Sequence, residues 1–314
     1  MKKMIICALV SVVAFTSMVS CQKDVPEVKM VPCTFSVSTV ADSFPALAAA
    51  GTKVALTGGK SLVWSPGDKF VIYKQLSTTG GYDDSVEPHE FITRNGGENA
   101  VFEGSLPENY GLDDGTYFAV CYKKLADGDK GKSYYKIGKT SIRLSLPCQQ
   151  YASAGGFDTD ALVLSASTSN SATVLDFENH TITFDINSAL FGVEVKGEGV
   201  SVISLSCADS FLTSDVFNLN MSSGGTSSLG QTYGTDSAVI ELYPDDAEET
   251  FAPGYYYFCV GGAAGSKVRS IGKLTVSYTI NGAEYAVTSQ NDYSVVSGKI
   301  YNLPISEEDC ALIQ

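Results

Sequence analysis

Few side chains in this sequence could carry out acid–base or metal chemistry. The two histidines, His89 and His180, lie beside Pro88 and after Asn179, so both are predicted on solvated loops. Neither has a metal-ligand partner at short spacing, whereas a ligand histidine normally comes with others. We therefore predict no bound metal and no other cofactor.

Three pairs of adjacent acids are the other candidates for chemistry: Asp83-Asp84, Asp113-Asp114 and Asp245-Asp246. Two carboxylates can hydrolyse a glycosidic bond, but only at a set separation across a cleft. Adjacent acids in a turn are more often solvated turn formers. The sequence also has no G-x-S-x-G, G-x-x-x-x-G-K-[ST] or G-x-G-x-x-G motif. We therefore predict that this chain is not an enzyme.

Cys21 has the clearest predicted chemistry. Lys2 and Lys3 precede an apolar run, Met4–Val19, which ends at Ser20-Cys21, a pattern typical of a secretory signal peptide. The end of this run resembles a bacterial lipobox, which implies cleavage between Ser20 and Cys21 and a diacylglycerol on the Cys21 thiol. One alternative is a plain signal peptide with a coincidental cysteine. The other is a membrane-spanning helix, for which the run is shorter than the ~20 apolar residues that a bilayer needs.

The rest of the composition restricts the partners. The chain has 314 residues and a net charge of −14, and cleavage after Ser20 removes two lysines and no acids. Such an acidic protein is not expected to bind nucleic acid or anionic lipid head groups. Four later cysteines lie in apolar, strand-like runs, where a cysteine is usually a small buried hydrophobe: Cys33, Cys121, Cys207 and Cys259.

The elements that must hold any site are predicted to be strands. Short runs rich in Val, Ile, Phe, Tyr and Thr alternate with Gly, Asp, Ser and Asn clusters, and helical periodicity of useful length is hard to find. This pattern predicts an all-β fold of β-sandwich type. Strands are predicted at Lys69–Gln75, Thr116–Tyr122, Ser141–Leu146, Ile182–Asp185, Phe191–Lys196, Ser201–Cys207, Tyr255–Val260 and Val295–Leu303.

A hairpin around Asn281-Gly282 is the best-defined of these elements. Apolar residues alternate with Thr and Ser from Leu274 to Ile280, and both turn residues tolerate positive φ, as a two-residue type I′ turn requires. That turn length predicts that Tyr278 pairs with Tyr285 and Val276 with Val287.

We predict two β-sandwich domains behind a signal peptide and a tether. Residues 1–20 are the signal peptide, 21–32 the lipidated tether, 33–168 the N-terminal domain and 169–314 the C-terminal domain. The boundary is placed in Ser165–Thr173, a run of small polar residues. The length agrees with two domains of about 150 residues.

Motifs are spread over most of the mature chain. Trp64-Ser65-Pro66-Gly67-Asp68 precedes a strand; Pro66-Gly67 is expected to make a turn, Asp68 to cap it and Trp64 to pack inward. Phe102-Glu103-Gly104-Ser105-Leu106, Thr183–Phe191 and Ser297–Leu303 follow. In this order they resemble the W-x-x-G-D, F-x-G-x-L, domain-opening and G-K-x-Y-x-L segments of the fimbrillin superfamily of Bacteroidales surface lipoproteins. The resemblance implies two transthyretin-like β-sandwiches.

The resemblance also implies a way of assembling. Family members include fimbrial stalk subunits, anchors and tip adhesins, and those that polymerise lose their first strand to a protease. A strand from a neighbouring subunit then fills the exposed groove, which is β-strand addition. Here the first strand is predicted at Cys33–Val40, with Phe35 and Val37 on one face, and the following loop, Ala41–Thr52, is suited to cutting.

Two departures from the family pattern argue against a stalk role. Family members often have Arg where this chain has Lys53, and the first arginine here is Arg94, so processing is predicted only at Lys53 or Lys60 by a lysine-tolerant protease. Only 11 residues (304–314) follow Leu303, and acids at 307–309 interrupt them. A donor strand should be longer and should alternate apolar residues.

The sequence thus supports a fimbrillin-like cell-surface lipoprotein that is a structural, anchor or tip subunit of fimbriae in adhesion. Its implied partners are other fimbrial subunits through β-strand addition, the outer membrane through the lipid anchor, and a host or bacterial surface receptor. The alternative is a glycan-binding outer-membrane lipoprotein of a nutrient-uptake system. A clustered aromatic platform would favour this alternative, and an openable first-strand groove the fimbrial interpretation.

Exposed aromatic residues are expected in both cases. Tyr255-Tyr256-Tyr257-Phe258 is the main candidate, because alternate rings of a strand face opposite sides. One set is expected in the core, and the other at the surface or at an interface.

Overall fold

The structure is a computed structural model that describes residues 28–39, 55–57, 61–74, 82–83, 88–97, 99–113, 115–121, 136–138, 141–152, 155–168, 174–208, 212–221, 227–232, 236–245, 249–261 and 268–313. In these ranges strands dominate, and the helical elements are two short 3-10 turns, η1 (Thr159–Ala161) and η2 (Glu307–Asp309). The all-β prediction is confirmed. No helix within the described residues has the length and apolarity to cross a bilayer.

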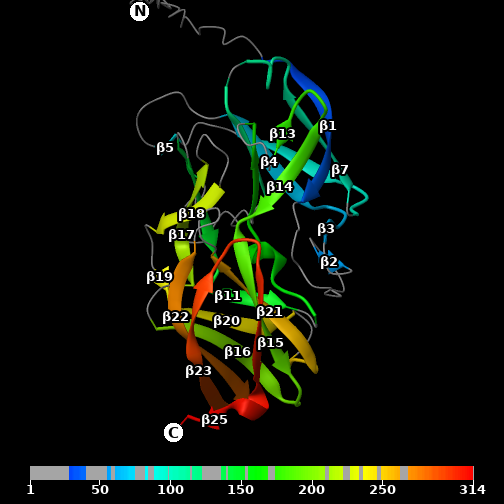
Figure 1. The fold of residues 1–314 in the computed structure, drawn as a ribbon. Coiled ribbons are helices and arrows are strands. Elements are labelled where there is room, and N and C mark those ends of the chain that lie inside the picture. The colour runs from blue at the N-terminus through cyan, green and yellow to red at the C-terminus, as the bar shows by residue number, and fades with distance from the viewer. Residues whose placement is uncertain are drawn as a thin grey trace, which may run out of the picture.

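The first sheet has eight strands and closes on itself. Its spatial order is β1 (Met30–Thr39), β7 (Ala100–Pro107), β6 (His89–Thr93), β4 (Lys69–Lys74), β8 (Tyr117–Cys121), β12 (Leu164–Ser167), β14 (Thr181–Ile186) and β13 (Leu175–Asp176). Because β1 also pairs with β14, the next-to-last strand of this row, the sheet closes on itself. Figure 1 shows β1, in blue, beside β14, in green, at the upper end of the molecule.

Aromatic rings fill the inside of the first sheet. Phe70 stacks on Phe91 with ring centroids 5.2 Å apart, and it lies 4.9 Å from Phe102. These rings come from β4, β6 and β7, and all three are buried because they occupy inward positions of alternating strands. Aromatic pairs at such separations contribute about 0.5–1.5 kcal/mol beyond their buried area.

Two further sheets pack face to face as a sandwich. The second sheet runs β11 (Gln149–Ala152), β20 (Val239–Pro244), β16 (Val200–Cys207), β22 (Arg269–Ile280), β23 (Ala283–Val295) and β25 (Ala311–Leu312); the third runs β21 (Gly254–Gly261), β15 (Ser188–Val195) and β24 (Ile300–Ser306). Buried residues of both sheets, among them Ile203, Val276, Phe191 and Phe258, form one core. Figure 1 places this sandwich in the lower half of the molecule.

The third sheet lies between the two cores. Phe191, Tyr256 and Phe258 belong to the sandwich core, whereas Tyr257 and Cys259 on the other face belong to the core of the first sheet. Of the tyrosine set predicted to reach the surface, only Tyr255 does so, with 43% exposure. Tyr257 is 2% exposed because the first core covers its face of the strand, so the prediction is wrong for this ring.

Buried polar residues connect β14 to β15 where the cores meet. The Asn187 Nδ2 atom donates to Ser165 Oγ at 2.8 Å, and the Gly298 N–H donates to the Ser188 carbonyl at 2.9 Å. Ser297 Oγ donates to the Asn187 carbonyl at 3.3 Å. Two motif segments that are far apart in sequence therefore fix each other here.

The smaller sheets complete the described chain. A fourth sheet holds β5 (Tyr82–Asp83), β9 (Lys136–Gly138), β10 (Ser141–Leu146), β17 (Thr213–Met221), β18 (Ser227–Thr232) and β19 (Asp236–Ser237), and β2 (Ala55–Thr57) pairs with β3 (Ser61–Val63). Pairing of β10 with β17 joins the two halves of the sequence in one sheet. The number of domains and the boundary at residue 168 stay predictions, and β14, which follows that boundary, bonds to both β1 and β12.

Most predicted strands match the structure. Seven of them coincide with β4, β8, β10, β14, β15, β16 and β21 to within three residues at either end. The hairpin prediction is confirmed to the residue pair: Tyr278 faces Tyr285 and Val276 faces Val287, with positive φ at Asn281 and Gly282.

Two strand predictions need correction. Val295–Leu303 is not one strand, because Gly298 takes a φ of +70° in a turn between the end of β23 and the start of β24. The first strand starts at Met30 rather than at Cys33, because Met30 and Val31 pair with the end of β7, so the last residues of the predicted tether are strand.

Candidate functional site

The candidate site is the position of β1 in the first sheet, which we call the first-strand groove: the space between β7 and β14 that β1 fills. One edge of β1 pairs antiparallel with β7 from Met30 to Val37, and the other pairs parallel with β14 from Ser36 to Thr39. The Ser36 N–H donates to the His180 carbonyl at 2.9 Å just before β14 begins. β1 is therefore the strand that closes the sheet, and a strand in its place would have hydrogen-bonding partners on both sides.

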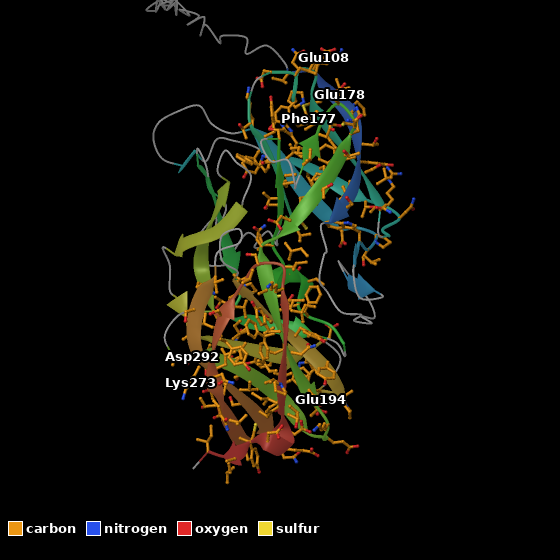
Figure 2. All side chains as sticks on the ribbon, in the orientation of Figure 1. Glu108, Phe177, Glu178, Glu194, Lys273 and Asp292 are labelled. Carbon is orange, nitrogen blue, oxygen red and sulfur yellow. The ribbon has the colours of Figure 1, made fainter. Side chains whose placement is uncertain are left out.

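The inward face of β1 is apolar, as its alternating pattern predicts. Phe35 and Val37 are 0% and 1% exposed, while Thr34 and Ser36 face solvent. The Phe35 ring meets Phe91 edge-on at 5.3 Å and Phe177 at 5.8 Å. Glu108, at the end of β7, and Phe177, in the turn before β14, lie at the same end of the groove (Figure 2).

The Trp64, Gly67 and Asp68 motif supports the floor of the groove. Trp64 is buried against Phe102 of β7 at 5.0 Å and Phe184 of β14 at 5.9 Å, so it touches both strands that flank β1. Gly67 takes a φ of +92° in the turn before β4, and the Asp68 carboxylate accepts a hydrogen bond from the Ser65 N–H at 2.7 Å. This turn therefore fixes the position of the Trp64 side chain between β7 and β14.

Gly104 explains the small residue in the F-x-G-x-L motif. It lies opposite Cys33 of β1 and Phe91 of β6, and the Phe91 ring covers it. A Cβ added to Gly104 would lie 2.7 Å from the Glu90 carbonyl and from the Phe91 ring. Phe102 and Leu106, the apolar residues of the motif, are buried on the inner face.

Cys33 and His180 meet at the mouth of the groove. The Cys33 Sγ atom lies 3.4 Å from His180 Nδ1, and burial raises the pKa of the Cys33 thiol. A neutral thiol is a poor nucleophile, so this pair serves as a contact between β1 and the turn before β14. Cys207 and Cys259 are buried as predicted, whereas Cys33 and Cys121 are half-buried.

The histidines and acids form no metal site within the described ranges. His180 is exposed in a turn, as predicted. The prediction is wrong for His89, which begins β6 half-buried, with its ring 4.9 Å from that of Tyr110. His89 faces inward because it alternates with buried Phe91 on the same strand.

Asp113 is the acid with the most partners in the site region. Its carboxylate accepts hydrogen bonds from Lys74 Nζ, from Tyr117 Oη at 2.8 Å and from the Gly115 N–H at 3.0 Å. The Lys74 ammonium, then Tyr117 and Gly115, lower the pKa of Asp113 to about 2. The carboxylate thus holds the turn that follows β7 against β4 and β8.

We expect this turn to loosen in acid. The folded-state pKa of Asp113 lies below the ordinary value of about 3.9, so its stabilisation is complete above pH 4 and is lost as the pH falls towards 2. Asp113→Asn should therefore lower the unfolding midpoint at pH 7, and its difference from the wild type should shrink as the pH falls through about 2. Thermal unfolding across this pH range measures the difference, and a gap that stays constant down to pH 2 would contradict the assignment.

The C-terminal residues belong to the body of the molecule. β24 pairs parallel with β15, and β25 pairs with the start of β23 through Leu312 and Ala311. Between them, the buried Glu307 carboxylate accepts hydrogen bonds from the N–H groups of Lys196, at 2.8 Å, and Gly197. Residues 300–313 are thus already paired within their own chain.

Glu307→Ala should cost about 2 kcal/mol of unfolding free energy, because two backbone N–H groups lose a charged acceptor. Glu308→Ala is the matched control: Glu308 is exposed and pairs with Lys196 at 3.3 Å on the surface, so its loss should change stability by less than about 0.5 kcal/mol. Urea unfolding of both variants gives the comparison. Equal losses would show that Glu307 does not pin this turn.

The other sequence-predicted site residues lie outside the described residues: Ser20, Cys21, Lys53 and Lys60, together with the loop Ala41–Thr52. Sequence reasoning missed β14 as the second neighbour of β1, and with it Phe177. No local signal could have found them, since the pairing joins segments about 145 residues apart.

No protein-family model and no curated protein matches this chain. Among solved structures, it is similar to a candidate cell adhesion protein from Bacteroides ovatus, with 12% identity over 91% of this chain and 96% of that one, and a TM-score of 0.46. A candidate cell adhesion protein from Bacteroides fragilis has 12% identity, coverage of 89% and 96%, and a TM-score of 0.38. The tip fimbrial protein Mfa3 from Porphyromonas gingivalis, with a C-terminal truncation, has 12% identity, coverage of 88% and 96%, and a TM-score of 0.37.

Proposed function

We propose that this chain is a non-enzymatic, lipid-anchored subunit of fimbrillin type at the outer surface of the cell. It serves adhesion as a structural, anchor or tip component of fimbriae. The order of the sequence motifs supports this proposal. The observation that carries it is the placement of β1, which begins soon after the predicted lipidation site and closes the first sheet between β7 and β14.

The first-strand groove is the place at which another subunit would join if β1 were cut away. A strand from another fimbrial subunit would replace β1 and take over its backbone hydrogen bonds to β7 and β14, which supply affinity without sequence specificity. Specificity would come from the positions of Phe35 and Val37, because alternate side chains of an added strand enter the core.

We further propose that β1 is retained and that Cys21 is a lasting anchor. The chain has no arginine before Arg94, which removes the expected cut site after the first strand. Residues 300–313 pair within their own chain rather than forming a loose donor strand. A subunit with a filled groove and a paired C-terminus suits an end of a fimbrium, or a surface protein that does not polymerise.

Mass spectrometry of the native protein tests the proposal directly. The expected species starts at Cys21, carries lipid on that residue and is uncut at Lys53 and Lys60. Cys21→Ser should abolish incorporation of labelled palmitate and release the protein from the outer membrane. A species that starts after Val40, or abundant SDS-resistant polymers, would contradict the proposal that Cys21 is a lasting anchor. A wild-type protein without lipid would contradict the proposed role as a lipid-anchored subunit.

A further inference from the structure

Two tyrosines lie side by side on the outer face of the second sheet, at its β11 edge. The parallel register of β11 and β20 puts Tyr151 opposite Tyr243, with ring centroids 5.7 Å apart and planes 31° apart. Tyr151 is 47% exposed and Tyr243 is half-buried, and neither belongs to one of the two cores. Figure 1 shows β11 beside β20 in the sandwich half of the molecule, away from β1.

Hydrogen-bonding side chains stand next to the rings on the same face. Gln149 lies opposite Glu241 two residues before the tyrosines, and Ser204 of β16 faces Glu241 from the other side. Their neighbours along the strands, among them Gln150 and Leu242, are buried, so alternation directs this polar set outward. The Tyr243 hydroxyl donates to Glu241 Oε2 at 2.9 Å, which fixes the carboxylate beside the rings.

We infer that this surface, the Tyr151–Tyr243 face, binds a neutral glycan through a pyranose ring. A pyranose offers an apolar C–H face that can lie on an aromatic ring, and its hydroxyls can pair with an amide, a carboxylate and a serine hydroxyl. The face supplies these groups as Gln149, Glu241 and Ser204 around the ring pair. Each of them accepts hydrogen bonds, and two of them also donate, which suits a ligand whose hydroxyls do both.

Charge narrows the ligand to neutral sugars. Glu241 places a negative group in the face, and the chain carries a net charge of −14. Sialylated or sulfated glycans would meet repulsion both at the site and at longer range. This inference concerns a different surface from the first-strand groove, so it holds or fails independently of fimbrial assembly.

Saturation-transfer NMR on the full chain tests the inference with four neutral probes: lactose, mannotriose, cellotetraose and chitotriose. Sialyllactose is the charged partner of lactose. At least one neutral sugar should bind, and Tyr151→Ala and Tyr243→Ala should each raise its Kd about tenfold or more, corresponding to the loss of about 1.4 kcal/mol. Tyr151→Phe keeps the ring and should bind like the wild type.

Tyr255→Ala is the matched control, because Tyr255 is similarly exposed but lies on the third sheet. It should leave the Kd unchanged. Glu241→Gln keeps the shape of the side chain. It should weaken binding of the neutral sugar and reduce the difference in Kd between the neutral sugar and sialyllactose. Matched thermal midpoints establish that each variant is folded.

Three results would overturn the inference: no transfer to any neutral probe, binding that the tyrosine variants leave intact, or a preference for sialyllactose.

Discussion

Phe35→Ala should cost about 4 kcal/mol of unfolding free energy, the largest effect expected from a change in β1. The Phe35 ring is 0% exposed and meets Phe91 and Phe177, so its loss leaves a cavity at the centre of the first-strand groove. Urea unfolding can be followed by the emission of Trp64, the one tryptophan in the chain, which lies in the same core.

Ser36→Ala is the control for Phe35→Ala, because it changes the exposed neighbour on the same strand and should alter stability by less than about 0.5 kcal/mol. A second measurement addresses β1 itself. After a specific cut engineered into the loop that follows β1, the Phe35→Ala protein should lose its first strand on gel filtration while the wild type retains it. If both proteins retained or both lost the first strand, packing of the Phe35 ring would not be what holds β1 in place.

Trp64→Ala should have an effect of similar size, about 4 kcal/mol. Trp64 packs on Phe102 and Phe184, which belong to the two strands flanking β1, so the change loosens both walls of the groove. Thermal unfolding followed by circular dichroism measures the loss of stability, and hydrogen exchange of the Ser36 amide reports whether the loosening reaches β1. Trp64→Phe should recover a large part of the stability, because it restores an aromatic ring. A Trp64→Ala protein as stable as the wild type would contradict the supporting role of the motif.

Local chemistry explains which parts of the fold were predictable. The hairpin from Leu274 to Thr288 was correct in its residue pairs because Asn281-Gly282 fixes turn length, and turn length fixes register. The single strand predicted from Val295 to Leu303 failed because alternation continues on both sides of Gly298, and the pattern alone does not separate a turn from a strand that contains glycine.

The errors at longer range have a different cause. Tyr257 was expected at the surface or an interface because a strand pattern does not reveal how many layers cover it, and the third sheet is covered on both faces. The closing pair of β1 and β14 depends on the topology of the whole first sheet.

The two candidate surfaces differ in how far the sequence indicated them. The apolar face of β1 was visible as alternation, but the partner strand β14 was not. The Tyr151–Tyr243 face was missed, although Gln149–Tyr151 and Glu241–Tyr243 share one alternation. What the sequence lacks is the parallel register that sets the two segments side by side.

The way β1 is paired also decides how the molecule resists force. A pull on the chain before Met30 acts along the length of β1, whose ladder to β7 and β14 spans Met30 to Thr39. Such a load shears β1 against its neighbours, so many backbone hydrogen bonds share it at once. They do not break one after another. β1 lies at the upper end of Figure 1 and the second sheet at the lower end, so tension between the chain before Met30 and the second sheet passes through β1. The first strand is therefore placed to bear mechanical load. Its backbone hydrogen bonds and the packing of the Phe35 ring would resist that load together.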